Sequence, residues 1–133
     1  MIYDSKELIT SFDTFIAWRP WWHDPTWKPY VENLHTDQNP ARKKGFHCVQ
    51  GMIPLYKVDE VGGLAVVPDT NNDRTQDELA HRYPYTEGTN SDWLELRMND
   101  PFIGKGVLVK CQAGDLILWD SRSIHGGLIL QPS

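Results

Sequence analysis

The sequence is poor in cysteine, has no long apolar run and carries no excess of positive charge. Its two cysteines, Cys48 and Cys111, lie far apart without a CxxC spacing, so neither a disulfide framework nor a thiolate zinc site is indicated. Strand-like residues flank both of them, which predicts buried thiols in a reducing compartment. The formal net charge of -5 argues against a nucleic-acid partner, and the short basic run at 42–44 is interpreted as a solvated loop.

The sequence also shows no pattern typical of a secretion signal or a membrane span. No stretch of about 18 or more apolar residues occurs, so a membrane span is not expected. The first residues, "MIYDSKELITSF", lack a basic region followed by an apolar one, as a secretion signal would have. We therefore expect a cytoplasmic protein that has neither a membrane nor a nucleic acid as its partner.

The composition predicts one folded domain built mainly from β-strands. A length of 133 residues with 40% hydrophobic residues and six tryptophans is typical of a single globular domain, 1–133, with its core at 11–127. A polar, turn-rich segment at about 69–105 is interpreted as an insertion that carries a short surface helix at 76–82, capped by Thr75. Short segments punctuated by Gly and Pro predict an all-β double-sheet jelly roll, with candidate strands at 12–18, 48–56, 63–67, 107–111 and 116–119.

The stretch "CQAGDLILWDSRSIHGG" at 111–127 places a histidine directly after a strand and a polar turn. Gly114 and Asp115 form a turn before the apolar strand, and 121–123 form a second turn, so that His125 begins the next strand. A single histidine is more often a core residue whose ring nitrogens are satisfied by the backbone. A functional interpretation of His125 therefore requires partners.

The stretch "ENLHTDQNP" at 32–40 supplies such partners. His35 and Asp37 are one residue apart, so in an extended segment both side chains leave the same face. Two histidines and one carboxylate are the set that holds Fe(II) in many oxygenases, leaving coordination positions open for co-substrate and dioxygen. His35, Asp37 and His125 would complete that set.

At these motifs the sequence resembles the phytanoyl-CoA dioxygenase-like (PhyH) family of Fe(II)/2-oxoglutarate-dependent oxygenases. The resemblance rests on "HTDQNP" at 35–40, "GFHCVQGMIPL" at 45–55, "GGLAVVP" at 62–68 and "AGDLILWDSRSIHGG" at 113–127. It implies a double-stranded β-helix, a cupin-like jelly roll, in which His35, Asp37 and His125 bind iron. It also implies that 2-oxoglutarate is decarboxylated to succinate while dioxygen hydroxylates a small organic substrate.

The sequence departs from the family at the anchor of the co-substrate. The family places an arginine roughly ten residues after the distal histidine to pair with a carboxylate of 2-oxoglutarate, whereas no arginine follows His125 here. The chain is therefore interpreted as truncated, a fragment or a diverged member, with Arg122, Arg19, Arg42 or Lys43 as substitutes. Gln50 and Met52 are predicted to line the cofactor pocket. The alternative function is a metal-binding or interaction module of the same fold that has lost catalysis.

The remaining histidines and the tryptophan-rich arm receive structural interpretations. His23 lies in a Pro-rich loop, His47 in a predicted strand and His81 in the predicted helix, and none of them belongs to a metal-ligand pattern. The tryptophans of the N-terminal arm are expected to close a small core rather than to select substrate; they are Trp18, Trp21, Trp22 and Trp27.

Overall fold

The structure is a computed structural model that describes residues 2–11, 13–17, 19, 23–27, 34–59, 62–85 and 91–129. The chain divides into two compact units, Met1–Tyr30 and Val31–Ser133. In the first unit the described element is the 3₁₀-helix η1 (Pro25–Trp27), whose start is capped by the Asp24 carboxylate accepting from Thr26 N at 2.9 Å. The strand predicted at 12–18 is wrong for its described residues 13–17, which form no strand. Phe15 and Ile16 are exposed there, and an apolar segment without a paired neighbour has nothing to hold it extended.

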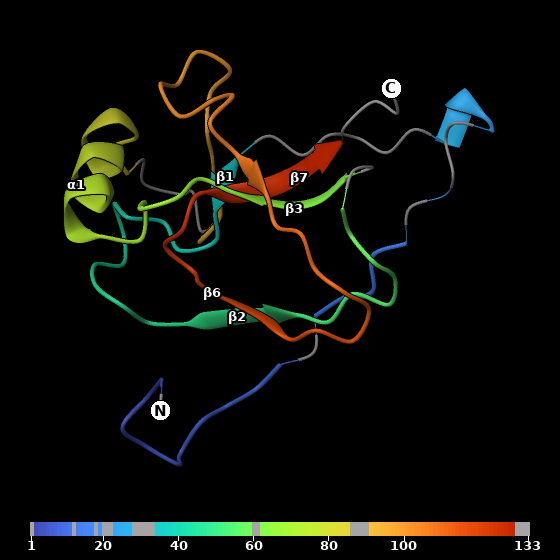
Figure 1. Cartoon of the computed structure of the whole chain (residues 1–133). Coiled ribbons are helices and arrows are strands. Elements are labelled where there is room, and N and C mark those ends of the chain that lie inside the picture. The colour runs from blue at the N-terminus through green and yellow to red at the C-terminus, as the bar shows by residue number, and fades with distance from the viewer. Residues whose placement is uncertain are drawn as a thin grey trace. The chain divides into compact units, whose positions relative to one another are not determined.

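The second unit contains a five-stranded antiparallel sheet with the strand order β4-β1-β7-β3-β5 (Figure 1). Its strands are β1 (His35–Thr36), β3 (Gly62–Val66), β4 (Leu94–Glu95), β5 (Val107–Leu108) and β7 (His125–Ile129). The longest pairing joins β3 to β7, from Gly62 opposite Ile129 to Val66 opposite His125. The order of the strands differs from their order in sequence, so the sheet is held together by pairings between distant segments.

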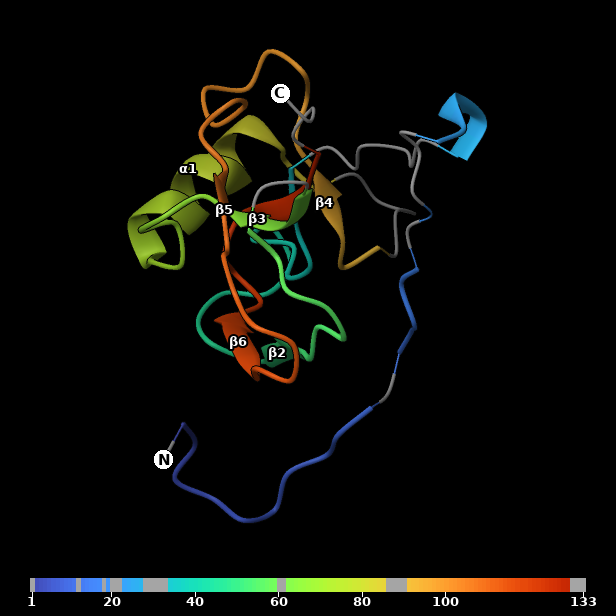
Figure 2. The ribbon, with the colours of Figure 1, turned by 45° about the vertical axis from the view of Figure 1, so that its right-hand side comes forward.

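A two-stranded antiparallel sheet, β2 (Val49–Met52) with β6 (Ile117–Asp120), forms a second layer beside the larger sheet (Figures 1 and 2). The strands β6 and β7 follow each other in sequence but belong to different sheets, so the turn at 121–123 carries the chain from one layer to the other. Gly114 has a φ of +86°, a left-handed conformation that suits glycine in the turn before β6. The prediction of a mainly β, double-sheet jelly-roll fold is confirmed.

Two of the predicted strands are shorter in the structure than in the sequence interpretation, whereas those predicted at 63–67 and 116–119 keep their length and are shifted by one residue, as β3 and β6. The strand expected at 48–56 ends at Met52, before Pro54, whose carbonyl accepts from Gly114 N at 2.8 Å. The strand expected at 107–111 ends at Leu108, and Cys111 forms an isolated bridge with Val58 instead. Propensity thus located these strands, while the position of the partner set their ends.

The helix α1 (Asp73–Arg82) begins earlier than predicted. Its N-cap is Asn72, whose side chain accepts from Thr75 N at 2.9 Å, so the expected cap at Thr75 is wrong. Asn is as good a cap as Thr, and it stands one turn closer to the preceding strand. The helix lies at the surface as predicted, with Asp73, Arg74, Asp77 and His81 exposed, and its other face contributes the fully buried Leu79 to the core.

The core of the second unit lies between α1 and the larger sheet. Its buried members are Val67, Leu79, Leu96 and Ile124. Two of these four, Leu79 and Leu96, come from the segment interpreted as an insertion, which also contributes β4 to the sheet. This segment is therefore an integral part of the fold.

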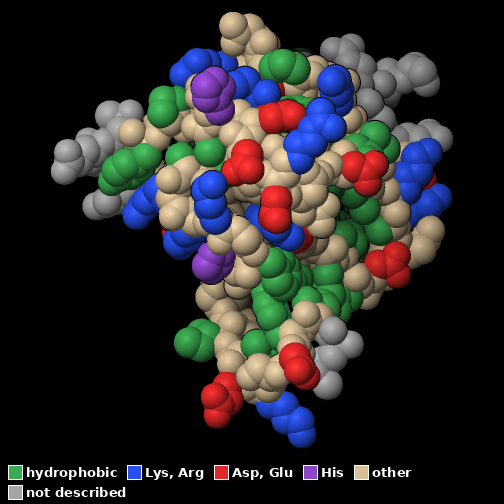
Figure 3. Space-filling view, turned by 90° about the vertical axis from the view of Figure 1, so that its left-hand side faces the viewer, with side chains coloured by type: hydrophobic (Ala, Val, Ile, Leu, Met, Phe, Trp, Pro, Cys, Tyr) green, Lys and Arg blue, Asp and Glu red, His purple; other side chains and the backbone are tan. Residues whose placement is uncertain are grey.

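The surface shows how the remaining composition is distributed. Figure 3 shows Lys and Arg side chains interspersed with Asp and Glu on one face of the molecule. Cys111 is buried as predicted, but Cys48 is exposed, because it lies just before β2 begins. Among the described residues, no helix has the length and apolar character needed to cross a membrane.

Candidate metal centre

The register of the larger sheet places His35 directly opposite His125. In the pairing of β1 with β7 these two residues are partners, and directly opposed residues of an antiparallel pair project to the same face. Their rings lie 4.5 Å apart between centroids and are tilted by 55°. Two histidines separated by most of the chain are thus brought side by side by a single strand pairing.

Asp37 joins them because it follows His35 by two residues. Its Oδ1 lies 3.7 Å from His35 Nε2, and its Oδ2 lies 3.1 Å from His125 Nε2. One ligand atom from each of the three residues lies within 4.8 Å of the others, and these three residues are named the ligand cluster below. Two ligands at about 2.1 Å from one metal and at a right angle to each other are about 3 Å apart, so these donors suit a shared ion.

A backbone contact sets the tautomer of His125. Its Nδ1 lies 2.9 Å from the carbonyl of Ser123, and because a carbonyl only accepts, Nδ1 carries the proton. Nε2 is therefore the nitrogen that faces Asp37, where it shares with the carboxylate either a proton or a metal ion. Hydrogen bonding of the outer ring nitrogen to a carbonyl is the usual way in which a metal-binding histidine is oriented.

The surroundings of Asp37 favour its ionised form. Burial by itself would raise its pKa, but hydrogen bonds from His125 and Gln50 and the electrostatic attraction of His125 and His35 outweigh burial and lower the pKa. The side chain is 31% exposed, whereas both histidines are buried, so the cluster opens on the side of the carboxylate. A deprotonated carboxylate between two imidazoles is chemically suited to a divalent transition metal.

Gln38 and Ser121 connect the two segments that carry the ligands. Ser121 Oγ donates to Gln38 Oε1 at 2.9 Å, and Gln38 N donates to the Ser121 carbonyl at 3.2 Å. The Gln38 amide also donates to the carbonyls of Lys43 and Gly45, at 3.1 and 2.6 Å. Both side chains are buried. This pair was missed by the sequence interpretation, although both residues stand within the motifs that carry the resemblance.

The residues predicted to line the cofactor pocket lie on β2. Gln50 Nε2 donates to Asp37 Oδ2 at 2.6 Å, so this side chain reaches the ligand cluster. Met52 is half-buried and pairs with Ile117 at the end of the same strand. A role of either residue in binding a co-substrate stays a prediction.

Arg122, the first candidate for the missing anchor, is engaged elsewhere. Its guanidinium donates to Asp120 at 2.8 Å and to Asp73 of α1 at 3.3 Å, and it lies over the ring of Phe46. A carboxylate of 2-oxoglutarate would have to compete with these two carboxylates. The substitutes have contacts of their own: Arg42 and Lys43 pair with Asp92, and Arg19 lies over the Trp27 ring within the first unit.

Two tryptophans that the sequence interpretation did not consider lie against the ligand cluster. The Trp119 ring is 5.4 Å from that of His125, and the Trp93 ring is 5.4 Å from that of His35. Of the tryptophans expected in a core, Trp27 is exposed, so that interpretation is wrong for it. The others, Trp18, Trp21 and Trp22, lie outside the described residues.

The other three histidines are exposed at the surface. His47 stands before β2 rather than in a strand, and its Nε2 is 2.8 Å from the Lys44 carbonyl. His23 and His81 are exposed. Among the described residues, the metal-type cluster is formed by His35, Asp37 and His125.

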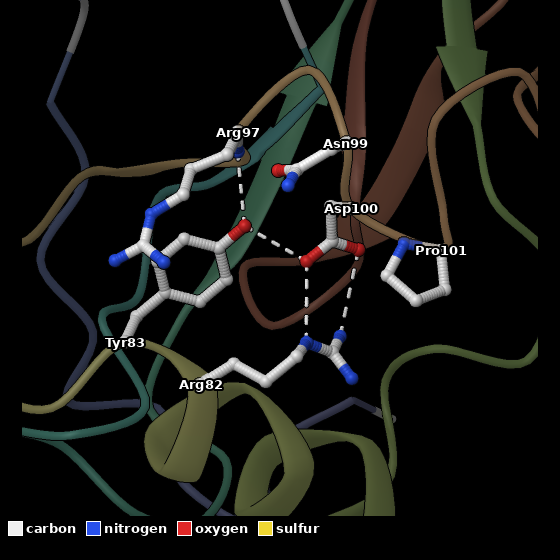
Figure 4. A pocket seen from close by; sticks show the side chains of 6 residues that line it. All are labelled: Arg82, Tyr83, Arg97, Asn99, Asp100 and Pro101. Carbon is white, nitrogen blue, oxygen red and sulfur yellow. Dashed lines mark hydrogen bonds and ion pairs between the residues drawn. The ribbon is translucent and has the colours of Figure 1, made fainter.

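A second polar cluster surrounds Asp100 in a small cavity of about 190 Å³ (Figure 4). The Asp100 carboxylate accepts from Tyr83 Oη at 2.8 Å, from Arg82 Nε at 3.2 Å and from Phe102 N at 3.0 Å. Tyr83 Oη in turn accepts from Arg97 N at 2.9 Å. We name these residues the Asp100 cluster.

Comparisons with known proteins identify the family of this chain. A family model described as Phytanoyl-CoA dioxygenase (PhyH) matches residues 9–128, a range that contains the whole ligand cluster. A curated relative, "Ava biosynthesis cluster protein O" of Aspergillus versicolor, is 27% identical over 135 aligned positions. This alignment covers 93% of the chain but 42% of the relative, so the chain spans less than half the length of that protein. No solved structure matches the chain significantly. With most of its length matched by the family model, the chain belongs to the phytanoyl-CoA dioxygenase (PhyH) family.

Proposed function

We propose that the chain carries the metal centre of an Fe(II)/2-oxoglutarate-dependent dioxygenase that hydroxylates a small organic substrate. The observation that carries this proposal is the convergence of His35, Asp37 and His125, with Nε2 of both histidines facing the carboxylate. When bound there, Fe(II) would supply oxidation of a C–H bond by dioxygen, coupled to conversion of 2-oxoglutarate to succinate and CO₂.

The protein's own part in this reaction is to hold and orient the ligands. The Ser123 carbonyl keeps His125 in the tautomer that presents Nε2, and Gln50 holds one oxygen of Asp37. Gln38 and Ser121 keep the two ligand-bearing segments in register. Three protein ligands on one side of a metal leave the opposite side for co-substrate and dioxygen.

Anaerobic titration of the 133-residue chain with Fe(II) and then with 2-oxoglutarate tests the proposal. We expect saturable Fe(II) binding, followed by a visible charge-transfer band when 2-oxoglutarate chelates the metal. The His35→Ala variant should show neither signal, whereas His81→Ala, an exposed histidine of α1, should behave like the wild type. Equal Fe(II) binding by His35→Ala and the wild type would contradict the proposal.

A second candidate is a metal-binding module that does not turn over. It is favoured by Arg122, whose charge is already balanced by Asp120 and Asp73 and is not available to a carboxylate ligand. A buried carboxylate without a cation loses several kcal/mol of solvation, so co-substrate affinity would be low. In the same titration this candidate predicts Fe(II) binding without a charge-transfer band.

A further inference from the structure

The cross-strand pair formed by Gln50 and Trp119 has two buried polar atoms without partners. The two residues are directly opposed in the pairing of β2 with β6, so their side chains project to the same face of the small sheet. Gln50 Oε1 and Trp119 Nε1 are both inaccessible to solvent and have no hydrogen-bond partner in the described part of the chain. Buried polar atoms of this kind are rare, because each costs the free energy of its lost hydration.

The assignment of these atoms follows from chemistry. Asp37 is a carboxylate and can only accept, so the group of Gln50 that lies 2.6 Å from it is the amide nitrogen. The carbonyl oxygen of Gln50 must then point away from Asp37. The indole of Trp119 has a donor and no acceptor. The pair therefore offers one free acceptor and one free donor.

Both side chains end at the ligand cluster. Gln50 binds Asp37 Oδ2, and the same oxygen lies 3.1 Å from His125 Nε2. The ring of Trp119 packs against the ring of His125. The unpaired donor and acceptor thus stand beside the residues that would hold the metal, where a substrate must also lie.

Gln50 and Trp119 are directly opposed across β2 and β6. A hydroxyl group placed between them would accept from Trp119 Nε1 and donate to Gln50 Oε1. A carboxylate would satisfy the indole but would place a negative charge against the Gln50 carbonyl and next to Asp37. A ketone would leave Gln50 Oε1 unpaired. We propose that Gln50 and Trp119 form a subsite that binds a hydroxyl group of the organic substrate beside the metal. This inference rests on the proposed function and adds a substrate class to it, namely compounds that carry an alcohol.

The test follows the indole N–H signals of the ¹⁵N-labelled chain by NMR. The Trp119→Phe variant assigns the signal of Trp119, and Trp93 provides the matched reference, because its ring also lies against a histidine of the ligand cluster but is 43% exposed. The probes are 2-propanol, acetone and acetate, which have similar size and present a hydroxyl, a neutral acceptor and a charged acceptor. Each titration is run on metal-free protein and on protein loaded with diamagnetic Zn(II).

We expect 2-propanol to shift the Trp119 signal saturably and to bind about five-fold more tightly than acetone, as one additional hydrogen bond would produce. The Trp93 signal should not move with either probe. In Gln50→Met the preference for 2-propanol over acetone should disappear, while the Trp119 signal still responds to both. Zn(II) affinity, measured separately, shows whether each variant keeps the ligand cluster.

Three results would overturn the inference. Shifts of the Trp119 signal that are equal for acetone and 2-propanol would show that Gln50 Oε1 takes no part. A stronger response to acetate would make the pair a carboxylate subsite. No response to any probe would mean that no ligand group reaches the two atoms. Failure of the wild type to bind Zn(II) or Fe(II) would instead contradict the proposed function, and the metal-free titrations would still decide the subsite.

Discussion

The described part of the second unit contains two polar clusters that are each built around a carboxylate but differ in how far their polar atoms are paired. In the Asp100 cluster the carboxylate has partners in Arg82, Tyr83 and the Phe102 amide, and its side chain is 1% exposed. In the ligand cluster Asp37 lies between two histidines, and the neighbouring Gln50 and Trp119 each keep an unpaired polar atom. A cluster whose groups satisfy one another stabilises the fold, whereas a cluster with unpaired donors and acceptors keeps hydrogen-bonding capacity for another molecule.

The largest effect on stability is expected from the Asp100 cluster. Asp100→Ala should lower the free energy of unfolding by about 3 kcal/mol, because it leaves the Tyr83 hydroxyl, the Phe102 amide and Arg82 without their acceptor. Chemical denaturation with and without Zn(II) measures the effect, which should be equal in both. The control Asp77→Ala removes an exposed carboxylate paired with Lys44 and should cost less than about 1 kcal/mol. If the loss of unfolding free energy in Asp100→Ala depended on Zn(II), the Asp100 cluster would not be purely structural and the distinction between the two clusters would be wrong.

The ligand cluster should show the opposite dependence. At a metal concentration about 100 times Kd, Fe(II) or Zn(II) should stabilise the wild type by about 2.7 kcal/mol. In Asp37→Ala this metal-linked stabilisation should vanish, because one of the three ligands is missing. Thermal unfolding at several metal concentrations provides the measurement. The prediction fails if the variant gains as much stability from the metal as the wild type does.

Gln38 combines features of the two clusters. The polar atoms of its side chain all have hydrogen-bond partners, as in the Asp100 cluster, and it is next in sequence to Asp37 of the ligand cluster. Gln38→Leu should cost about 2 kcal/mol, because two backbone carbonyls and the Ser121 hydroxyl lose their partner. It should also weaken metal binding, because the segments of Asp37 and His125 lose the side-chain bond between Gln38 and Ser121 and keep only their backbone contacts. Gln112→Leu changes an exposed glutamine and should stay within about 0.5 kcal/mol of the wild type. Metal affinity is measured by competition with a chelator under conditions in which Gln38→Leu is still folded. This measurement separates an effect on the position of the ligands from an effect on the stability of the fold. Unchanged metal affinity would exclude a positioning role for Gln38.

The smallest effect is expected at Arg122. Because its guanidinium is paired with Asp120 and Asp73, Arg122→Ala should change 2-oxoglutarate affinity less than about two-fold. Titration of the Fe(II)-loaded variant with 2-oxoglutarate measures this affinity. If Arg122 were the anchor of the co-substrate, its loss would cost about 2 to 5 kcal/mol of binding free energy instead.

The predictions that the structure corrects concern features that depend on contacts between segments far apart in the sequence. Local pattern located α1 but placed its start at Thr75, because the choice between Asn72 and Thr75 as the cap depends on where the preceding strand ends. It identified Cys48 as strand-like but could not show that the strand begins one residue later. The burial of Leu79 likewise depends on the sheet that packs against the helix.

The sequence by itself determined the β-rich class, the turns around β6 and the three residue types of the ligand cluster. The two-residue spacing of His35 and Asp37 fixes their common face, because alternation is a local property of an extended chain. Only the tertiary structure decided that His125 lies opposite His35, that β6 and β7 belong to different sheets, and that Gln50 and Trp119 meet with unpaired atoms. Strand register joins segments far apart in the chain, and it is set by the packing of the whole sheet rather than by the residues next to each site.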